Sequence, residues 1–189
     1  MKKWLIIIAT LVLTACGSSN NDGKAYYQLP ATVQPASQAV SQGDHHLLWI
    51  DQITLADFLS ANGMVYQTSD VQYVIASNNL WASPLDQQLR NTLTTNLARA
   101  LPGWIVASQP LGQEQSALSM NITGFHGRYD GKVIVSGEWL LRQKGEIITR
   151  PFRIELNQQA DGYDAMVKTL AEAWQQEAQS IAAELLRRQ

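Results

Sequence analysis

Three consecutive strand patterns, joined by two tight-turn signals, restrict the fold of this 189-residue chain more than any other feature. Apolar residues alternate with polar ones from Leu118 towards Phe125, and two further apolar runs cover 133–141 and 146–156. Asp130-Gly131 separates the first two runs, and Lys144-Gly145 separates the last two. An Asp-Gly step flanked by such runs is a strong hairpin signal. The pattern therefore predicts an antiparallel meander in the second half of the chain.

Shorter strand signals precede the meander. Runs of aromatic and β-branched residues bounded by turn residues are typical of strands, and Ser69-Asp70 between two such runs predicts a hairpin. A short β-type segment near the start of the chain is expected to dock on the main sheet. The predicted segments are 26–29, 47–53, 64–68, 71–75 and 104–107.

Two amphipathic helices complete the pattern. Ser83 is a favourable N-cap and Pro84 suits the first position of a helix whose leucines recur every four residues, at Leu85, Leu89, Leu93, Leu97 and Leu101. Asp161 is expected to cap the second helix, whose apolar face comprises Tyr163, Met166, Val167, Leu170, Trp174, Ile181 and Leu185. Strands in runs with two such helices predict an α+β fold, with a mostly antiparallel sheet and both helices packed on one face.

The N-terminus carries the pattern of an export signal. Lys2 and Lys3 precede an apolar run over 4–13, which is far shorter than the roughly 20 residues that span a bilayer. The following Leu13-Thr14-Ala15-Cys16 resembles the bacterial lipobox. That resemblance implies acylation of Cys16 and cleavage after Ala15. The alternative is an ordinary secretory signal that happens to contain a cysteine, but Cys16 is the only cysteine of the chain.

These signals divide the chain into three parts. Residues 1–15 are the predicted signal peptide, residues 16–24 the lipidated N-terminus with a polar, flexible tether, and residues 25–189 the folded domain. Inner-membrane lipoproteins of enteric-type bacteria usually carry Asp after the acylated cysteine. Because Gly17 stands there, we expect the protein on the outer membrane, anchored by its lipid and facing the periplasm.

We find no constellation that predicts catalysis, a cofactor or a metal. His45, His46 and His126 have no partners at ligand spacing, and His126 is expected on the surface or half-buried. The acidic residues are scattered singly, and we interpret the helix carboxylates, including Glu177, as solvated. Acidic residues outnumber basic ones by 16 to 14, without the basic patch that nucleic-acid binding requires. The chain is therefore predicted to be neither an enzyme nor a nucleic-acid binder.

Large apolar side chains leave one segment open to two interpretations. Most of the tryptophans are expected in the core. The stretch 57–64 lies between strands and carries Phe58, Leu59 and Met64, which are either tucked under the domain or exposed for interaction. We take these three residues as the candidate partner surface.

Several segments of the mature chain together resemble a known family. They are 26–29, Asp57-Phe58-Leu59, the stretch 79–85 leading into the leucine-striped helix, 127–132 and the helix start at 161–163. With them, residues from about 25 to 187 resemble the ABC-type transport auxiliary lipoproteins. The resemblance implies an accessory subunit of an MCE-type lipid transport system, which supports envelope integrity by receiving an inner-membrane-anchored MCE conduit at the outer membrane. Because such conduits are symmetric homo-oligomers, a ring of copies of this chain is also expected.

Two other functions remain compatible with the residues. One is a lipid-binding periplasmic carrier that holds a lipid within its own domain, although the meander has few strands with which to close a barrel. The other is a structural lipoprotein of the envelope-stress or peptidoglycan-associated kind. Co-purifying phospholipid would favour the carrier, and the identity of the main protein partner separates the structural role from docking.

Overall fold

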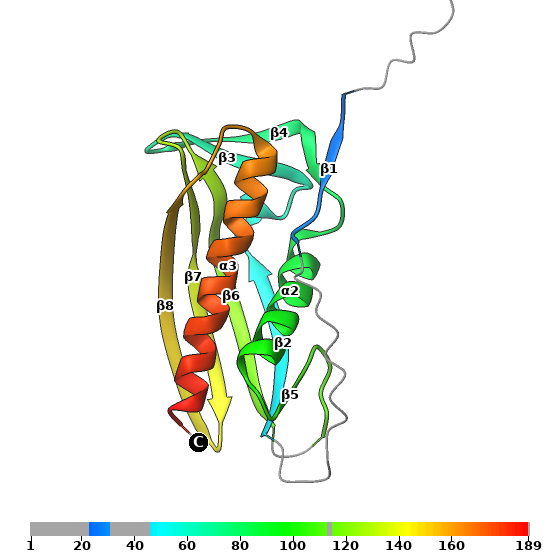
Figure 1. The fold of residues 1–189 in the computed structure, drawn as a ribbon, viewed down its shortest axis with the longest axis vertical. Coiled ribbons are helices and arrows are strands. Elements are labelled where there is room, and N and C mark those ends of the chain that lie inside the picture. The colour runs from blue at the N-terminus through cyan, green and yellow to red at the C-terminus, as the bar shows by residue number, and fades with distance from the viewer. Residues whose placement is uncertain (1–22, 31–45, 113–114, 189) are drawn as a thin grey trace, which may run out of the picture.

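The computed structural model describes residues 23–30, 46–112 and 115–188 and contains one sheet and two helices (Figure 1). The predicted signal peptide, Cys16 and His45 lie outside the described residues. The elements in chain order are β1 (Ala25–Tyr27), β2 (His46–Leu55), the 3-10 turn η1 (Asp57–Leu59), β3 (Gly63–Ser69), β4 (Gln72–Trp81), α2 (Leu85–Ala100), β5 (Trp104–Ala107), β6 (Ser116–Arg128), β7 (Lys132–Gln143), β8 (Glu146–Asn157) and α3 (Tyr163–Leu186).

The strands form an eight-stranded mixed sheet. Its order is β1-β4-β3-β6-β2-β5. β2 pairs with the first part of β6 and β3 with its last two residues, and β7 pairs with β6 over most of its length. β8 then pairs with β7. The predicted meander β6-β7-β8 and the predicted hairpin β3-β4 are antiparallel, as expected. The pairings β1-β4, β2-β5, β2-β6 and β3-β6 are parallel. The α+β class is therefore confirmed, whereas the description of the sheet as mostly antiparallel fits only its locally connected strands.

Both helices lie on the same side of the sheet in Figure 1, and the main core lies between the two layers. All five leucines of the α2 stripe are buried. The helices are joined by Trp174 of α3, whose Nε1 donates a hydrogen bond to the carbonyl oxygen of Leu89 at 3.2 Å. Phe125 of β6 meets the same indole edge-on, with ring centroids 6.4 Å apart. The amphipathic spacing thus identified the faces that meet the sheet.

The predicted N-caps differ from those in the structure. Pro84, and not Ser83, occupies the cap position of α2, and its ψ of 133° is not helical. The Ser83 carbonyl instead accepts a hydrogen bond from Gln88 Nε2 at 2.9 Å. At α3 the cap position belongs to Gly162, whose φ of 99° favours glycine, and not to Asp161. Both helices therefore begin one residue later than predicted and have no side-chain cap.

Candidate functional site

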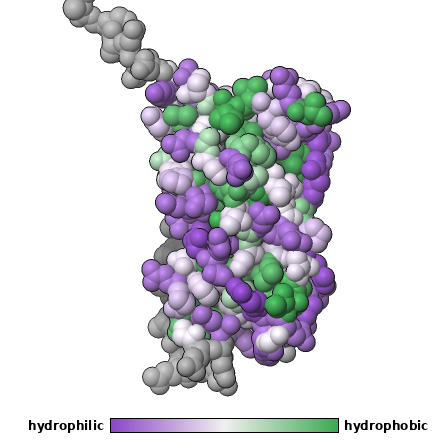
Figure 2. All heavy atoms as spheres, turned by 180° about the vertical axis from the view of Figure 1, so that it is seen from behind, coloured by the Kyte–Doolittle hydropathy of each residue, from purple (hydrophilic) through white to green (hydrophobic). Residues whose placement is uncertain are grey.

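Exposed apolar side chains of the described residues are concentrated at one end of the molecule. Six of the nine large apolar residues with substantial exposure lie on β1, on β4 or in the turns beside them, and we call these six the hairpin end: Tyr26, Val71, Tyr73, Val74, Ile75 and Tyr129. Figure 1 shows the β3-β4 hairpin lying across the end of the domain at which β1 enters. Figure 2 shows apolar surface at this end of the opposite face. The hairpin end is thus a cluster of exposed apolar side chains for which the sequence pattern gave no explanation.

An aromatic stack supports the hairpin end from below. The Tyr73 ring lies 5.2 Å from the Phe58 ring of η1 and meets the buried His126 ring of β6 edge-on at 5.1 Å. His126 Nδ1 lies 2.9 Å from the carbonyl oxygen of its neighbour Gly127. Burial lowers the pKa of His126, which holds this ring neutral at physiological pH. The prediction of an exposed or half-buried His126 is therefore wrong, because Tyr73 covers the ring.

Polar contacts hold the turns of the hairpin end together. The Tyr129 hydroxyl donates a 2.6 Å hydrogen bond to Asp70 Oδ1, which joins the β6-β7 turn to the β3-β4 turn and raises the pKa of Tyr129. Beside it, the Arg128 guanidinium pairs with Asp130 at 2.8 Å and with Glu155 at 2.9 Å. Hydrogen bonds from Arg128 lower the pKa of Asp130 to about 2. The two turns are thus fixed relative to each other, although their side chains are largely exposed.

The predicted partner surface is only partly available. Leu59 is 1% exposed and Met64 is fully buried, so both side chains belong to the core. The interpretation of these two residues as a partner surface is wrong, because η1 turns the segment inward and packs it under the sheet. Phe58 remains half-buried next to Tyr73 and stays a predicted contact residue. The lipidation site, Cys16, lies outside the described residues and also stays a prediction.

Glu177 is a buried acid that the sequence pattern misplaced. It lies on the sheet-facing side of α3 with 3% exposure, and its Oε1 accepts a 2.9 Å hydrogen bond from Trp139 Nε1 of β7. Burial raises the pKa of Glu177 to about 7, and the hydrogen bond from Trp139 opposes that effect. The interpretation of Glu177 as a solvated helix residue is wrong. Its spacing, three residues after Trp174 and four before Ile181, is the signal that places it on the buried face.

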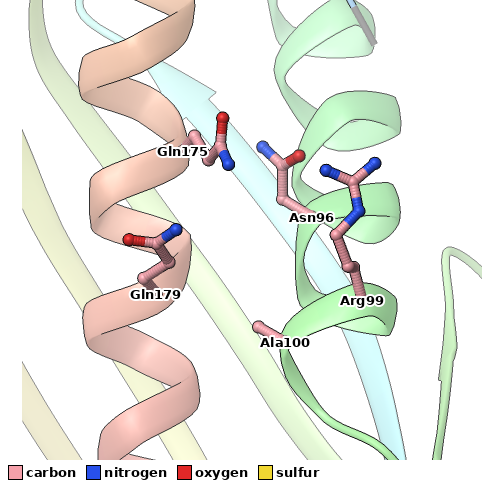
Figure 3. A pocket seen from close by; sticks show the side chains of 5 residues that line it. All are labelled: Asn96, Arg99, Ala100, Gln175 and Gln179. Carbon is pink, nitrogen blue, oxygen red and sulfur yellow. The ribbon is translucent and has the colours of Figure 1, made fainter. Parts of the chain in front are cut away.

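Two depressions in the described surface are shallow. One, of about 100 Å³, lies between the helices and is lined by Asn96, Arg99, Ala100, Gln175 and Gln179 (Figure 3). The other, of about 200 Å³, lies over β2, β6 and β7 and includes Gln52, Asn121 and Glu138. Both are smaller than the roughly 300–1,000 Å³ of typical small-molecule sites. Neither therefore has the volume to enclose a phospholipid.

Three further observations concern the described part of the chain. Over residues 23–30, 46–112 and 115–188, no three His, Cys, Asp or Glu side chains gather as a metal site requires. None of the helices in these ranges is both long and apolar enough to cross a membrane. The exposed His46 stacks on Trp104, with ring centroids 4.8 Å apart. This histidine therefore makes an aromatic contact.

Comparison with known proteins identifies the family. The model of the ABC-type transport auxiliary lipoprotein component matches residues 27–182, which is most of the chain. The chain belongs to this family. Among curated transport auxiliary lipoproteins, it is 62% identical to the intermembrane transport lipoprotein PqiC of Escherichia coli K12 over 187 residues, 99% of each chain. The PqiC protein of Shigella flexneri matches with the same identity and coverage.

Solved structures support the fold of this transport auxiliary lipoprotein. A crystal structure of a protein described only as uncharacterized is 60% identical, with a TM-score of 0.78 over 86% of this chain and 98% of that one. A crystal structure from Xanthomonas campestris is 14% identical, with a TM-score of 0.66 over 84% of this chain and 92% of that one. At that low identity the second match supports the fold alone.

Proposed function

We propose that this protein is the outer-membrane-anchored lipoprotein subunit of a Pqi-type intermembrane lipid transport system. The observation that carries the proposal is the end-to-end similarity to proteins named intermembrane transport lipoprotein. The lipobox-like Leu13-Thr14-Ala15-Cys16 supplies the anchor, and Gly17 favours the outer membrane. Several acyl chains on one cysteine give stable attachment, because each buried CH2 contributes about 0.8 kcal/mol.

The proposed role is docking. An MCE protein anchored in the inner membrane, PqiB-like in this system, forms the conduit, and the lipoprotein receives it at the periplasmic face of the outer membrane. A rigid α+β domain held on a short tether suits this role, because it presents a fixed surface at a fixed membrane. Since such conduits are symmetric, we propose that several copies of this chain form a ring around the conduit. Native mass spectrometry of detergent-extracted protein that shows only monomer would contradict the ring.

The shallow depressions favour docking over carrying. A carrier must enclose acyl chains, and the depressions of about 100 and 200 Å³ are too small to do so. Extraction of the purified protein with organic solvent tests this directly. Docking predicts no stoichiometric phospholipid beyond the covalent acyl chains, whereas one phospholipid per chain would support the carrier.

Two substitutions at the anchor test the proposed function. Cys16→Ala removes the acylation site, and Gly17→Asp keeps it but introduces the residue typical of inner-membrane retention. We expect the tagged wild-type protein to fractionate with the outer membrane and to co-purify with the MCE protein after cross-linking. Both variants should keep the wild-type circular dichroism spectrum but fail to restore detergent resistance to cells that lack the protein.

The outcomes of these variants separate location from lipidation. A soluble Cys16→Ala protein that fully restores envelope integrity would contradict the anchoring role. If Gly17→Asp remains in the outer membrane, the sorting argument is wrong, but lipidation itself is unaffected. Cross-linking that recovers no MCE protein from wild-type cells would contradict docking.

A further inference from the structure

Apolar side chains with large exposed fractions lie on β4 and in the turn before it. Val71 is 90% exposed, and Tyr73, Val74 and Ile75 are each about half exposed, so both faces of this strand expose apolar side chains, although Tyr73 also contacts Phe58 and His126. The paired strand β3 is buried along most of its length. Among residues 23–30, 46–112 and 115–188, no strand pairs with the outer edge of β4 from Gln72 to Asn78, because β1 pairs only with Asn79, Leu80 and Trp81. This strand therefore exposes apolar side chains and backbone groups together.

We propose that the hairpin end rests on the lipid surface in which the acyl chains of Cys16 are anchored. The inference depends on the proposed lipid anchor and adds an orientation to it: the β3-β4 hairpin contacts the bilayer, and the β7-β8 turn points away from it. The partner is a phospholipid interface. It is recognised through partly inserted apolar side chains and not through a binding pocket.

The length of the chain before the domain supports this contact. Six residues lie between Cys16 and Gly23, where the described structure begins, so seven Cα–Cα steps connect the two. Seven such steps reach at most about 25 Å in a fully extended chain. The open part of β4 begins next to Asn79, the residue that pairs with Ala25 at the start of β1. The hairpin end is thus within reach of the membrane, whereas the C-terminus of α3 lies at the other end of the long axis (Figure 1).

The residue types at the hairpin end fit the headgroup region of a bilayer. Tyrosine is enriched at membrane interfaces because its ring is apolar and its hydroxyl is polar, and Tyr26, Tyr73 and Tyr129 are the exposed tyrosines of the described residues. Val71 projects from the turn with almost its whole side chain exposed. The open edge of β4 keeps the contact interfacial, because unpaired backbone groups remain hydrated among headgroups but not in hydrocarbon.

Site-specific fluorescence tests the orientation in the full-length acylated protein. Cys16 is the only cysteine, and acylation blocks its thiol, so a cysteine introduced elsewhere is the sole labelling site. We would label Val71→Cys at the hairpin end and Ile147→Cys at the opposite end, where the native side chain is 66% exposed. Each protein is reconstituted into phosphatidylethanolamine–phosphatidylglycerol vesicles that carry a nitroxide quencher at headgroup depth.

The expected result is a clear difference between the two positions. The ratio of quenching at position 71 to that at position 147 should be well above one, with a blue-shifted emission only at position 71. The additional substitutions Val74→Ser and Ile75→Ser should bring the ratio to about one while the protein still floats with the vesicles and keeps its circular dichroism spectrum. Both side chains are partly exposed, so these changes leave the core intact.

Other occupants of the hairpin end would overturn the proposal in recognisable ways. Equal quenching at both positions in wild-type protein contradicts the orientation. If position 71 becomes shielded only when the MCE protein is added, the surface belongs to that partner. If labels on two copies show energy transfer but no lipid quenching, the surface is a self-association interface. Vesicle flotation is scored in every sample. Flotation without quenching refutes only the hairpin contact, whereas loss of flotation refutes the Cys16 anchor as well.

Discussion

The buried carboxyl of Glu177 makes the stability of this protein depend on pH in a direction opposite to that of most acidic residues. A carboxylate whose pKa is lowered by an ion pair or hydrogen bonds in the fold stabilises that fold when it is charged. Glu177 is 3% exposed and receives one hydrogen bond, from Trp139, and none of the ion pairs among the described residues includes it. Burial therefore favours its neutral form, and its pKa rises from 4.5 to about 7.

The sign and the size of the effect follow from proton linkage. The folded protein binds the proton more tightly than the unfolded chain, so this stabilisation is fully present below pH 4.5 and is lost as the pH rises towards 7. A shift of that size corresponds to about 3 kcal/mol, of which about 2 kcal/mol falls between pH 5 and pH 8. Glu177→Gln removes the titration and keeps a carbonyl oxygen that can accept from Trp139 Nε1.

Urea denaturation of residues 17–189 at several pH values, followed by tryptophan fluorescence, measures the effect. The free energy of unfolding of Glu177→Gln minus that of wild type should increase by about 2 kcal/mol from pH 5 to pH 8. Glu172→Gln removes one carboxylate from the exposed side of the same helix and controls for the change in net charge. Parallel stability curves for Glu177→Gln and wild type over this range would refute the reasoning.

Three other substitutions test the packing. Trp139→Phe removes the only hydrogen bond that lowers the pKa of Glu177, so the pH at which stability is lost should move upward in the same denaturation series. Leu93→Ala, in the fully buried stripe of α2, should lower the free energy of unfolding by about 3 kcal/mol in urea. Gly137→Ala would place a Cβ 2.3 Å from the backbone oxygen of Asn121, so we expect loss of soluble protein on expression.

Local patterns predicted the elements of this fold well, because each depends on neighbouring residues. The Asp130-Gly131 and Lys144-Gly145 turns lie between β6, β7 and β8 as predicted, and the glycines adopt φ values of 77° and 81°. The leucine spacing likewise identified the buried face of α2. In each case the turn or the repeat carries its own conformational requirement, so no information about distant residues is needed.

Pairing between distant strands could not be predicted in the same way. β2 pairs with β6 in parallel although a hairpin, a helix and a short strand separate them in sequence. An alternating pattern indicates which face of a strand is buried, but it does not indicate whether the neighbouring strand is parallel or antiparallel. The burial of Leu59 and Met64 could not be predicted for the same reason. Whether a loop with apolar residues is covered depends on how the strands assemble, and the local sequence does not show this.

The strand β4 shows why the hairpin end is best explained by a contact outside the domain. Its sequence pattern predicted a strand, yet Tyr73, Val74 and Ile75 are consecutive, so in any β-strand they must point to both faces. A strand that only packs within its own domain has one polar face towards solvent and one apolar face towards the core, as in the first part of β6. In β4, by contrast, both faces carry partly exposed apolar side chains, and Val71 in the turn is 90% exposed. This distribution indicates an apolar environment on both sides of the hairpin. The bilayer in which we propose that Cys16 is anchored would be such a medium, whereas a single partner face would cover only one side of the strand.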